Sequence, residues 1–117
     1  MIHDQTKAAI LKFRTDRDWE QFHSPRNLAM AISIEAAELL EPFRWASDDE
    51  AKRVAETRKR EIADEMADLV ILLTYLAHDL SIDFEQVVSA KLAANAVKYP
   101  VDAFRGSSRK YSQPQQD

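Results

Sequence analysis

The stretch EIADEMADLVILL, residues 61–73, decides the fold of this chain. Its acidic residues Glu61, Glu65 and Asp68 recur at steps of four and three, and its apolar residues recur at the same steps. Residues three and four apart share one face of a helix, so the stretch predicts a helix with an acidic stripe beside an apolar stripe. Like charges at these spacings destabilise a helix by roughly 0.2–0.5 kcal/mol per pair. No lysine or arginine lies within the stretch to relieve that repulsion, which favours a dedicated role for the acids.

A second acidic pair, Glu35 and Glu38, has the same three-residue spacing in the earlier apolar segment SIEAAELLEPF. Mg²⁺ prefers hard oxygen ligands and commonly bridges protein carboxylates to substrate phosphates. One acidic pair on a helix usually faces water, but two pairs, each flanked by apolar residues, favour a magnesium site. Its predicted ligands are four acids: Glu35, Glu38, Glu65 and Asp68.

The composition of the 117-residue chain favours a single all-α domain. Gly106 is the only glycine, while the helix formers alanine and leucine are plentiful. The absence of cysteine excludes disulfides, thiolate zinc sites and cysteine nucleophiles. We expect a helical domain over residues 1–100, followed over residues 101–117 by a polar, basic tail whose last residues are disordered.

Charge and hydropathy narrow the range of partners. The net charge of −4 argues against stable nucleic-acid binding, which rests on many basic contacts to phosphate. No apolar run is long enough to span a bilayer, and no opening run resembles a signal peptide. We therefore expect a cytoplasmic protein with no membrane partner.

Capping and breaker residues set the expected helices. The first runs over residues 4–22 with Asp4 as its N-cap, the second over residues 25–40, and the last over residues 84–98. The tail after Pro100 is expected to be extended, or to become ordered on binding a ligand.

The interval between the acidic pairs needs a break, although residues 48–80 contain neither glycine nor proline. In a simple hairpin turning near Ala46, Glu38 would lie about 12 Å from the turn and Glu65 about 28 Å from it, at 1.5 Å per residue. The two pairs could not then share a metal. We therefore predict a break, a short separate helix or a looping connection between about Glu50 and Arg60.

Two further groups of residues have the chemistry to bind a nucleotide. Lys91, Asn95, Lys98 and Tyr99 follow helical spacing and suit phosphate and sugar oxygens, although a solvated helix end would have the same pattern. Aromatic rings near the first two helices could stack on a base, although such rings more often form the core. The candidates for the base pocket are Trp19, His23 and Trp45.

Six motifs, taken in order, resemble the MazG-like nucleotide pyrophosphohydrolases, and most of all the small dCTP pyrophosphatase branch. They are W-E-x-F-H-x-P-R-N at 19–27, E-x-x-E-L at 35–39, F-x-W at 43–45, E-x-A-D at 65–68, K-x-x-x-N-x-x-K-Y-P at 91–100 and R-G-S-S-R-K-Y at 105–111. One position departs from the vertebrate dCTP enzymes: Ile10 stands where a histidine is expected, nine residues before Trp19. That difference leaves the preferred base open.

The resemblance implies a four-helix bundle, assembled as a homodimer or homotetramer, that uses Mg²⁺ to hydrolyse a nucleoside triphosphate to the monophosphate and diphosphate. It implies that the four acids bind the metal, with Glu35 or Glu38 also able to orient the attacking water as general base. By the same resemblance, substrate phosphates and sugar are contacted by Lys91, Asn95, Lys98, Tyr99, Arg109 and Lys110.

The expected function is thus Mg²⁺-dependent pyrophosphohydrolysis of dCTP or a related or modified deoxynucleotide. Two alternatives stay open. One is an enzyme similar to phosphoribosyl-ATP pyrophosphohydrolase, which uses similar acidic helices; the W-E-x-F-H-x-P-R-N stretch and the paired tryptophans weigh against it. The other is a non-catalytic helical module that binds a nucleotide or a partner protein, against which the intact acidic pairs argue.

Overall fold

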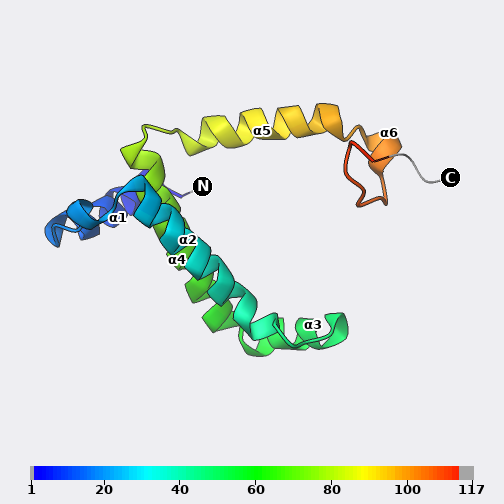
Figure 1. Cartoon of the computed structure of the whole chain (residues 1–117), viewed down its shortest axis with the longest axis horizontal. Coiled ribbons are helices and arrows are strands. Elements are labelled where there is room, and N and C mark those ends of the chain that lie inside the picture. Colours follow the sequence, from blue (N-terminus) through cyan, green and yellow to red (C-terminus); the bar gives the residue numbers. More distant parts are fainter. Residues whose placement is uncertain (1, 114–117) are drawn as a thin grey trace. The chain divides into compact units, whose positions relative to one another are not determined.

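The computed structural model describes residues 2–113, and all of its regular elements in that range are helices (Figure 1). The predicted all-α class is confirmed. The elements are α1 (Asp4–Asp16), η1 (Glu20–Phe22), α2 (Pro25–Leu40), η2 (Glu41–Phe43), α3 (Asp48–Thr57), α4 (Lys59–Asp79), α5 (Phe84–Lys98) and α6 (Val101–Phe104), where η marks a 3₁₀ turn. None of these helices is long and apolar enough to cross a membrane. The described residues form two compact units, 2–82 and 83–113.

Helices α2 and α4 lie side by side and form the centre of the first unit (Figure 1). Leu28 of α2 is 1% exposed, and Tyr75 and Ala77 of α4 are also buried. Helix α1 packs against α4 as well. Helix α2 has the predicted bounds, because the Ser24 hydroxyl accepts a hydrogen bond from the Asn27 N–H at 3.1 Å and Pro25 occupies the first turn.

The first helix is shorter than predicted, and its predicted cap is wrong. Helix α1 starts at Asp4 itself, with His3 in the N-cap position and no side-chain cap. It ends at Asp16 because Asp18 adopts a left-handed conformation (φ 52°). The Trp19 N–H then donates to the Arg14 carbonyl and the Asp18 N–H to the Thr15 carbonyl, which is a Schellman cap. Aspartate tolerates this conformation better than most residues, so no glycine was needed to mark the stop.

The predicted break between about Glu50 and Arg60 is confirmed. Helix α3 ends at Thr57 and α4 begins at Lys59, with Arg58 between them (φ −113°, ψ 25°). The Ser47 hydroxyl caps α3 by accepting from the Glu50 N–H at 3.2 Å. Because α3 is a separate short helix that packs on both η2 and α4, Glu65 does not have to lie at the far end of one long hairpin.

The second unit contains α5 and a folded tail. Helix α5 has the predicted bounds, and Asp83 caps it by accepting from the Gln86 N–H. The tail is more ordered than the extended segment we expected as far as Gln113: it forms α6 and then a turn in which aromatic rings gather. The Tyr99 ring meets Phe104 edge-on at 4.8 Å and Tyr111 at 6.0 Å between centroids. The expected disorder of the last residues falls on 114–117, outside the described residues.

Candidate metal and nucleotide site

Helices α2 and α4 bring three of the four predicted metal ligands together. Glu35 and Glu38 project from α2 and Glu65 from α4, and one carboxylate oxygen from each lies within 4.8 Å of the others. Glu35 and Glu65 are half-buried, whereas Glu38 is exposed. The break at Arg58 makes this arrangement possible, because it separates α4 from α3 before the acidic stripe begins.

The acids of this cluster repel one another and are incompletely satisfied. The Oε2 atoms of Glu35 and Glu65 are buried and have no hydrogen-bond partner. Buried polar atoms are normally paired, so two such oxygens side by side need an explanation. The neighbouring Glu65 carboxyl raises the pKa of Glu35 to about 7, together with burial and the charges of Glu38 and Asp68. A divalent cation would satisfy both oxygens and remove the repulsion, so these residues fit Mg²⁺.

Asp68, the fourth predicted ligand, lies three residues after Glu65 on α4 and is exposed. It is not among the three acids whose oxygens meet within 4.8 Å. Its negative charge nevertheless contributes to the raised pKa of Glu35, which places it in the same electrostatic environment.

An open hollow of about 410 Å³ lies beside Glu65, at the junction of α3 and α4. It is lined by Thr57, Arg58, Arg60, Glu61, Asp64 and Glu65. The Arg58 guanidinium donates two hydrogen bonds to the Glu61 carboxylate, at 2.6 and 2.7 Å. That contact raises the pKa of Arg58 and lowers the pKa of Glu61, so the Glu61 carboxylate is ionised and already has a cationic partner.

The residues predicted for the base pocket lie in two different places within the first unit. Trp19 and His23 flank η1 near the end of α1, where the Trp19 ring meets Phe13 edge-on at 5.7 Å. The His23 ring lies 5.3 Å from the Tyr75 ring of α4, and burial and the charge of Arg14 lower the pKa of His23. Trp45 follows η2 and is 84% exposed, with the Arg44 guanidinium 4.7 Å from its ring centre.

The predicted phosphate and sugar contacts lie in the second unit. Lys91 is exposed on α5 and Asn95 is half-buried, while the Lys98 ammonium is 5.0 Å from the Tyr111 ring centre. The Tyr99 ring packs within the aromatic cluster of the tail.

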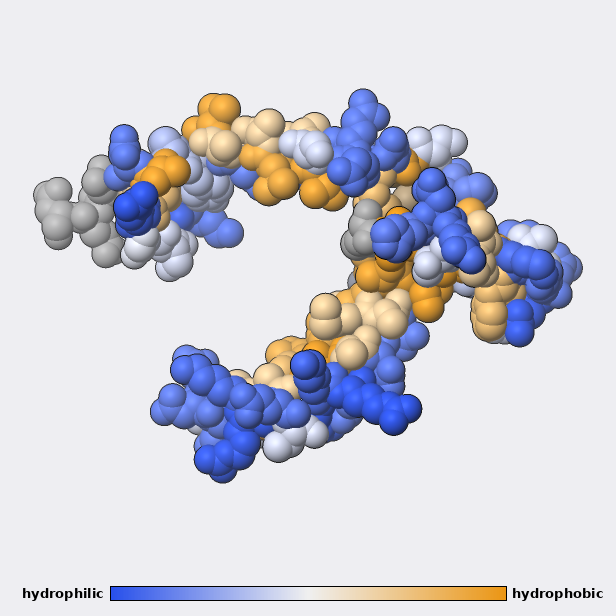
Figure 2. Space-filling view, turned by 180° about the vertical axis from the view of Figure 1, so that it is seen from behind, coloured by the Kyte–Doolittle hydropathy of each residue, from blue (hydrophilic) through white to orange (hydrophobic). Residues whose placement is uncertain are grey.

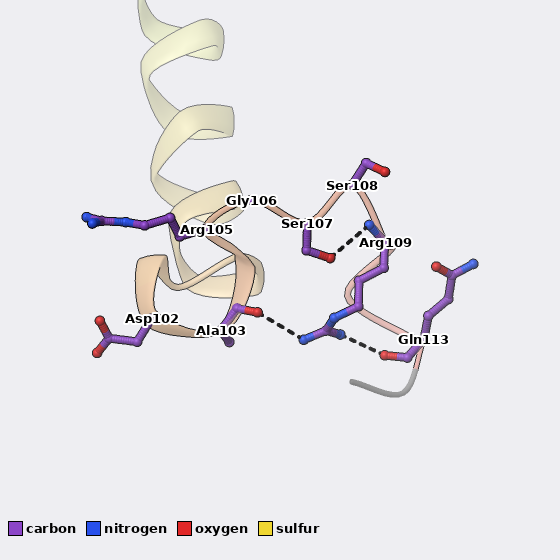
Figure 3. A pocket seen from close by; sticks show the side chains of 8 residues that line it. All are labelled: Asp102, Ala103, Arg105, Gly106, Ser107, Ser108, Arg109 and Gln113. Carbon is purple, nitrogen blue, oxygen red and sulfur yellow. Dashed lines mark hydrogen bonds between the residues drawn. The ribbon is translucent and has the colours of Figure 1, made fainter. Parts of the chain in front are cut away.

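Around the tail is a hollow of about 630 Å³, lined by Asp102, Ala103, Arg105, Gly106, Ser107, Ser108, Arg109 and Gln113 (Figure 3). Gly106 adopts a positive φ of 74° at its turn. The Arg109 guanidinium donates to the carbonyls of Gln113 (2.7 Å) and Ala103 (3.3 Å) (Figure 3). It also lies 4.1 Å from the centre of the Phe104 ring. Arg109 therefore holds the tail together, whereas Lys110 is exposed and its backbone N–H donates to the Gln113 side chain.

One group of residues near η1, Arg14, Tyr75 and Asp79, was not predicted from the sequence. Arg14 is 3% exposed, and its guanidinium donates two hydrogen bonds to the carboxylate of Asp79, 65 residues later. The same guanidinium lies over the buried Tyr75 ring. Nothing in the local spacing of Arg14 marks it as buried, because its partners come from a distant helix.

Comparisons with known proteins identify the family of this chain. The model of a family described as MazG-like matches residues 30–113. The chain belongs to the MazG-like family. A crystal structure of a pyrophosphatase from Archaeoglobus fulgidus superposes with a TM-score of 0.81 at 40% identity, covering 86% of this chain and 99% of that one. The resemblance read from the six motifs is therefore confirmed.

Curated relatives of this MazG-like chain carry the name dCTP pyrophosphatase 1. The mouse protein (Mus musculus) is 43% identical over 103 residues, and the human protein (Homo sapiens) is 38% identical over 104 residues. The matched regions cover 86% and 87% of this chain. The chain spans 61% of the length of each of these relatives.

Proposed function

We propose that this MazG-like protein is a Mg²⁺-dependent nucleoside triphosphate pyrophosphohydrolase that converts a (d)NTP and water to the (d)NMP and diphosphate. The observation that carries the proposal is the meeting of Glu35, Glu38 and Glu65, with two buried oxygens left unpaired. The substrates we favour are dCTP and related or modified deoxynucleotides, supported by the relatives named dCTP pyrophosphatase 1.

Glu35, Glu38, Glu65 and Asp68 would hold Mg²⁺, which supplies charge neutralisation for the triphosphate and a lowered pKa for nearby water. The Glu65 carboxyl, burial and the charges of Glu38 and Asp68 raise the pKa of Glu35 to about 7, so the ionised form of Glu35 is unfavourable at neutral pH. Binding of the cation would favour the ionised form of Glu35 and lower its pKa from that raised value.

One carboxylate of the cluster would orient the attacking water and accept its proton. Glu38 suits this role because it is the exposed member of the three acids, whereas Glu35 and Glu65 are half-buried and each has a buried Oε2 atom. The water attacks the α-phosphorus, the bond to the bridging oxygen breaks, and diphosphate leaves with the electron pair.

Basic side chains of α5 and the tail are the proposed contacts to the leaving diphosphate. Lys91, Lys98 and Lys110 are exposed cations, which suits them to phosphate oxygens, and Asn95 offers an amide to the sugar. The Arg109 guanidinium is hydrogen-bonded to backbone carbonyls of the tail, so Arg109 would hold the tail in place rather than contact phosphate. Trp19 and His23, which precede α2, and Trp45, which follows η2, stay the proposed contacts to the base.

We also propose that the protein is a homodimer or homotetramer that completes a four-helix bundle. Hydrophobic side chains line the surface of α2 and α4, and separately that of α5 (Figure 2). Met30, Ile34 and Met66 are each more than half exposed, and so are Leu92 and Val97. Exposed apolar surface of this kind is typical of an interface. Light scattering after size exclusion will give the number of subunits.

The test of the activity is diphosphate release from a panel of canonical and modified dNTPs and NTPs, with and without Mg²⁺. We expect release with Mg²⁺ from at least one deoxynucleotide, and its loss in Glu38→Ala. Glu61→Gln is the matched control, because Glu61 is an exposed acid of the same helical stripe that is already paired with Arg58. If the wild type binds nucleotide with Mg²⁺ but releases no product from any of the panel, the non-catalytic module replaces this proposal.

A further inference from the structure

We propose that Arg14 is a positioning residue for nucleotide recognition. Its contact with Asp79 fixes the corner formed by residues 17–23, between α1 and α2, which carries Trp19 and His23. This inference rests on the proposed function, because it concerns the end of the site that would meet the base. Arg14 and Asp79 lie outside every motif that carries the family resemblance.

The side chain of Arg14 is anchored to α4. Its Nη1 and Nη2 donate to the two oxygens of Asp79 at 2.9 and 2.7 Å, and its guanidinium lies 4.6 Å from the centre of the Tyr75 ring. The Arg14 side chain is 4% exposed, whereas that of Asp79 is 28% exposed. A two-pronged contact between a planar guanidinium and a carboxylate fixes orientation as well as distance.

The backbone of Arg14 is anchored to the corner. Its carbonyl accepts the N–H groups of Arg17 and Trp19, each at 3.2 Å, which closes the end of α1 around the left-handed residue Asp18. The same residue thus joins α4 through its side chain and Trp19 through its main chain. Moving the guanidinium would move the start of η1.

The corner continues to His23 through the same group of side chains. The Arg14 Nε lies 3.8 Å from a carboxylate oxygen of Glu20, and the Glu20 carbonyl accepts the His23 N–H at 3.0 Å. The His23 ring packs on Tyr75, the ring that the guanidinium covers. Both predicted base contacts of this corner, Trp19 and His23, are therefore tied to Arg14 by one or two contacts.

The anchor lies too far from the acids to take part in the reaction. Tyr75 and Asp79 follow Glu65 by ten and fourteen residues on α4, which is about 15 and 21 Å along the axis at 1.5 Å per residue. A change at Arg14 should therefore alter how the base is held and leave the triphosphate and its metal in place. A purely structural ion pair would instead alter all affinities together, or none.

The test compares Arg14→Lys and Asp79→Asn with the wild type, using kcat and KM for the best deoxynucleotide and competitive inhibition by inorganic tripolyphosphate, which has no base. Lys12→Gln is the matched control, since it removes an exposed cation from the same helix. We expect KM to rise about tenfold, the loss of one stacking contact, with kcat and the inhibition constant of tripolyphosphate close to wild type. An unchanged KM, or a matching rise in the tripolyphosphate constant, overturns the inference.

A second measurement needs no turnover. In a Trp45→Phe background only Trp19 fluoresces among the tryptophans, because the chain has two. We expect acrylamide to quench Trp19 more strongly in both anchor variants than in Lys12→Gln, and unchanged quenching overturns the inference. If the wild type releases no diphosphate from any nucleotide, the proposed function fails, while this readout still decides whether Arg14 positions the corner.

Discussion

Replacing Glu35 by glutamine will stabilise the metal-free protein while abolishing turnover. The Glu65 carboxyl, burial and nearby charges raise the pKa of Glu35 from 4.5 to about 7, so ionised Glu35 is unfavourable in the folded chain. A raised carboxyl pKa contributes stability at low pH and loses it as pH rises through 4.5 to about 7. Above pH 7 Glu35 is ionised in the folded protein, and the full free-energy cost of its charge lowers the stability. Glutamine removes that charge with little change of shape, and its amide can donate to the unpaired oxygen of Glu65.

The size of the effect follows from the shift. Each pKa unit corresponds to about 1.4 kcal/mol, which gives roughly 3 kcal/mol before correction. Water reaches the exposed side of the cluster, where Glu38 lies, so screening reduces the gain to about 1–2 kcal/mol. For a chain of 117 residues that is an increase in Tm of about 4–8 °C.

The assay is thermal and urea unfolding at pH 8 in EDTA, on the wild type and Glu35→Gln, repeated at pH 5 where the difference should shrink. Glu61→Gln again serves as the control: the Arg58 contact lowers the pKa of Glu61, so its removal should not stabilise the protein. A Glu35→Gln protein that is less stable than the wild type in EDTA at pH 8 would refute the reasoning, because Glu35 would then support the fold.

Three further predictions concern the metal, the buried ion pair and a strained turn. Mg²⁺ at one hundred times its dissociation constant should increase the free energy of unfolding of the wild type by about 2.7 kcal/mol. Thermal unfolding followed by circular dichroism should therefore show a higher Tm with Mg²⁺ for the wild type and no change for Glu65→Gln. The Arg14 contact lowers the pKa of Asp79 below its ordinary 3.8, so the stability it provides is present above that pH and lost as pH falls through the lowered value. The stability difference between the wild type and Asp79→Asn should therefore narrow in acid titrations monitored by fluorescence. Ser81 has φ 54° where α4 ends, so Ser81→Gly should stabilise the protein by about 0.5–1 kcal/mol in urea unfolding, and a loss of stability would contradict the strain.

Local patterns predicted the helices well wherever caps and breakers acted within a few residues. Ser24 and Asp83 cap the starts of α2 and α5, each by accepting a hydrogen bond from the backbone N–H three residues later. Pro25 occupies the first turn of α2. The end of α1 could not be predicted in this way, because the left-handed conformation of Asp18 is held by backbone bonds rather than by a glycine. The break at Arg58 was predicted from geometry alone, since two acidic pairs can meet only if the long helix is interrupted.

In the candidate site, too, the features set by local spacing were predicted and those set by distant contacts were not. The pairing of Glu35 with Glu65 followed from spacing on each helix plus one requirement, that the two helices meet. The roles of the four acids and of the α5 residues stay predictions, supported by the family. The Arg14 and Asp79 contact could not be predicted, because it joins residues 65 apart and neither has a distinctive neighbour. The ordering of the tail around Arg109 was also missed, since its bonds are to backbone carbonyls that the sequence does not single out.

The most direct test of the central claim is hydrolysis of the best deoxynucleotide in ¹⁸O-labelled water, with mass analysis of both products. The account predicts one label in the nucleoside monophosphate, unlabelled diphosphate, a requirement for Mg²⁺, and loss of both products in Glu65→Gln. Label in the diphosphate, release of orthophosphate with a nucleoside diphosphate, or undiminished turnover by Glu65→Gln would contradict it.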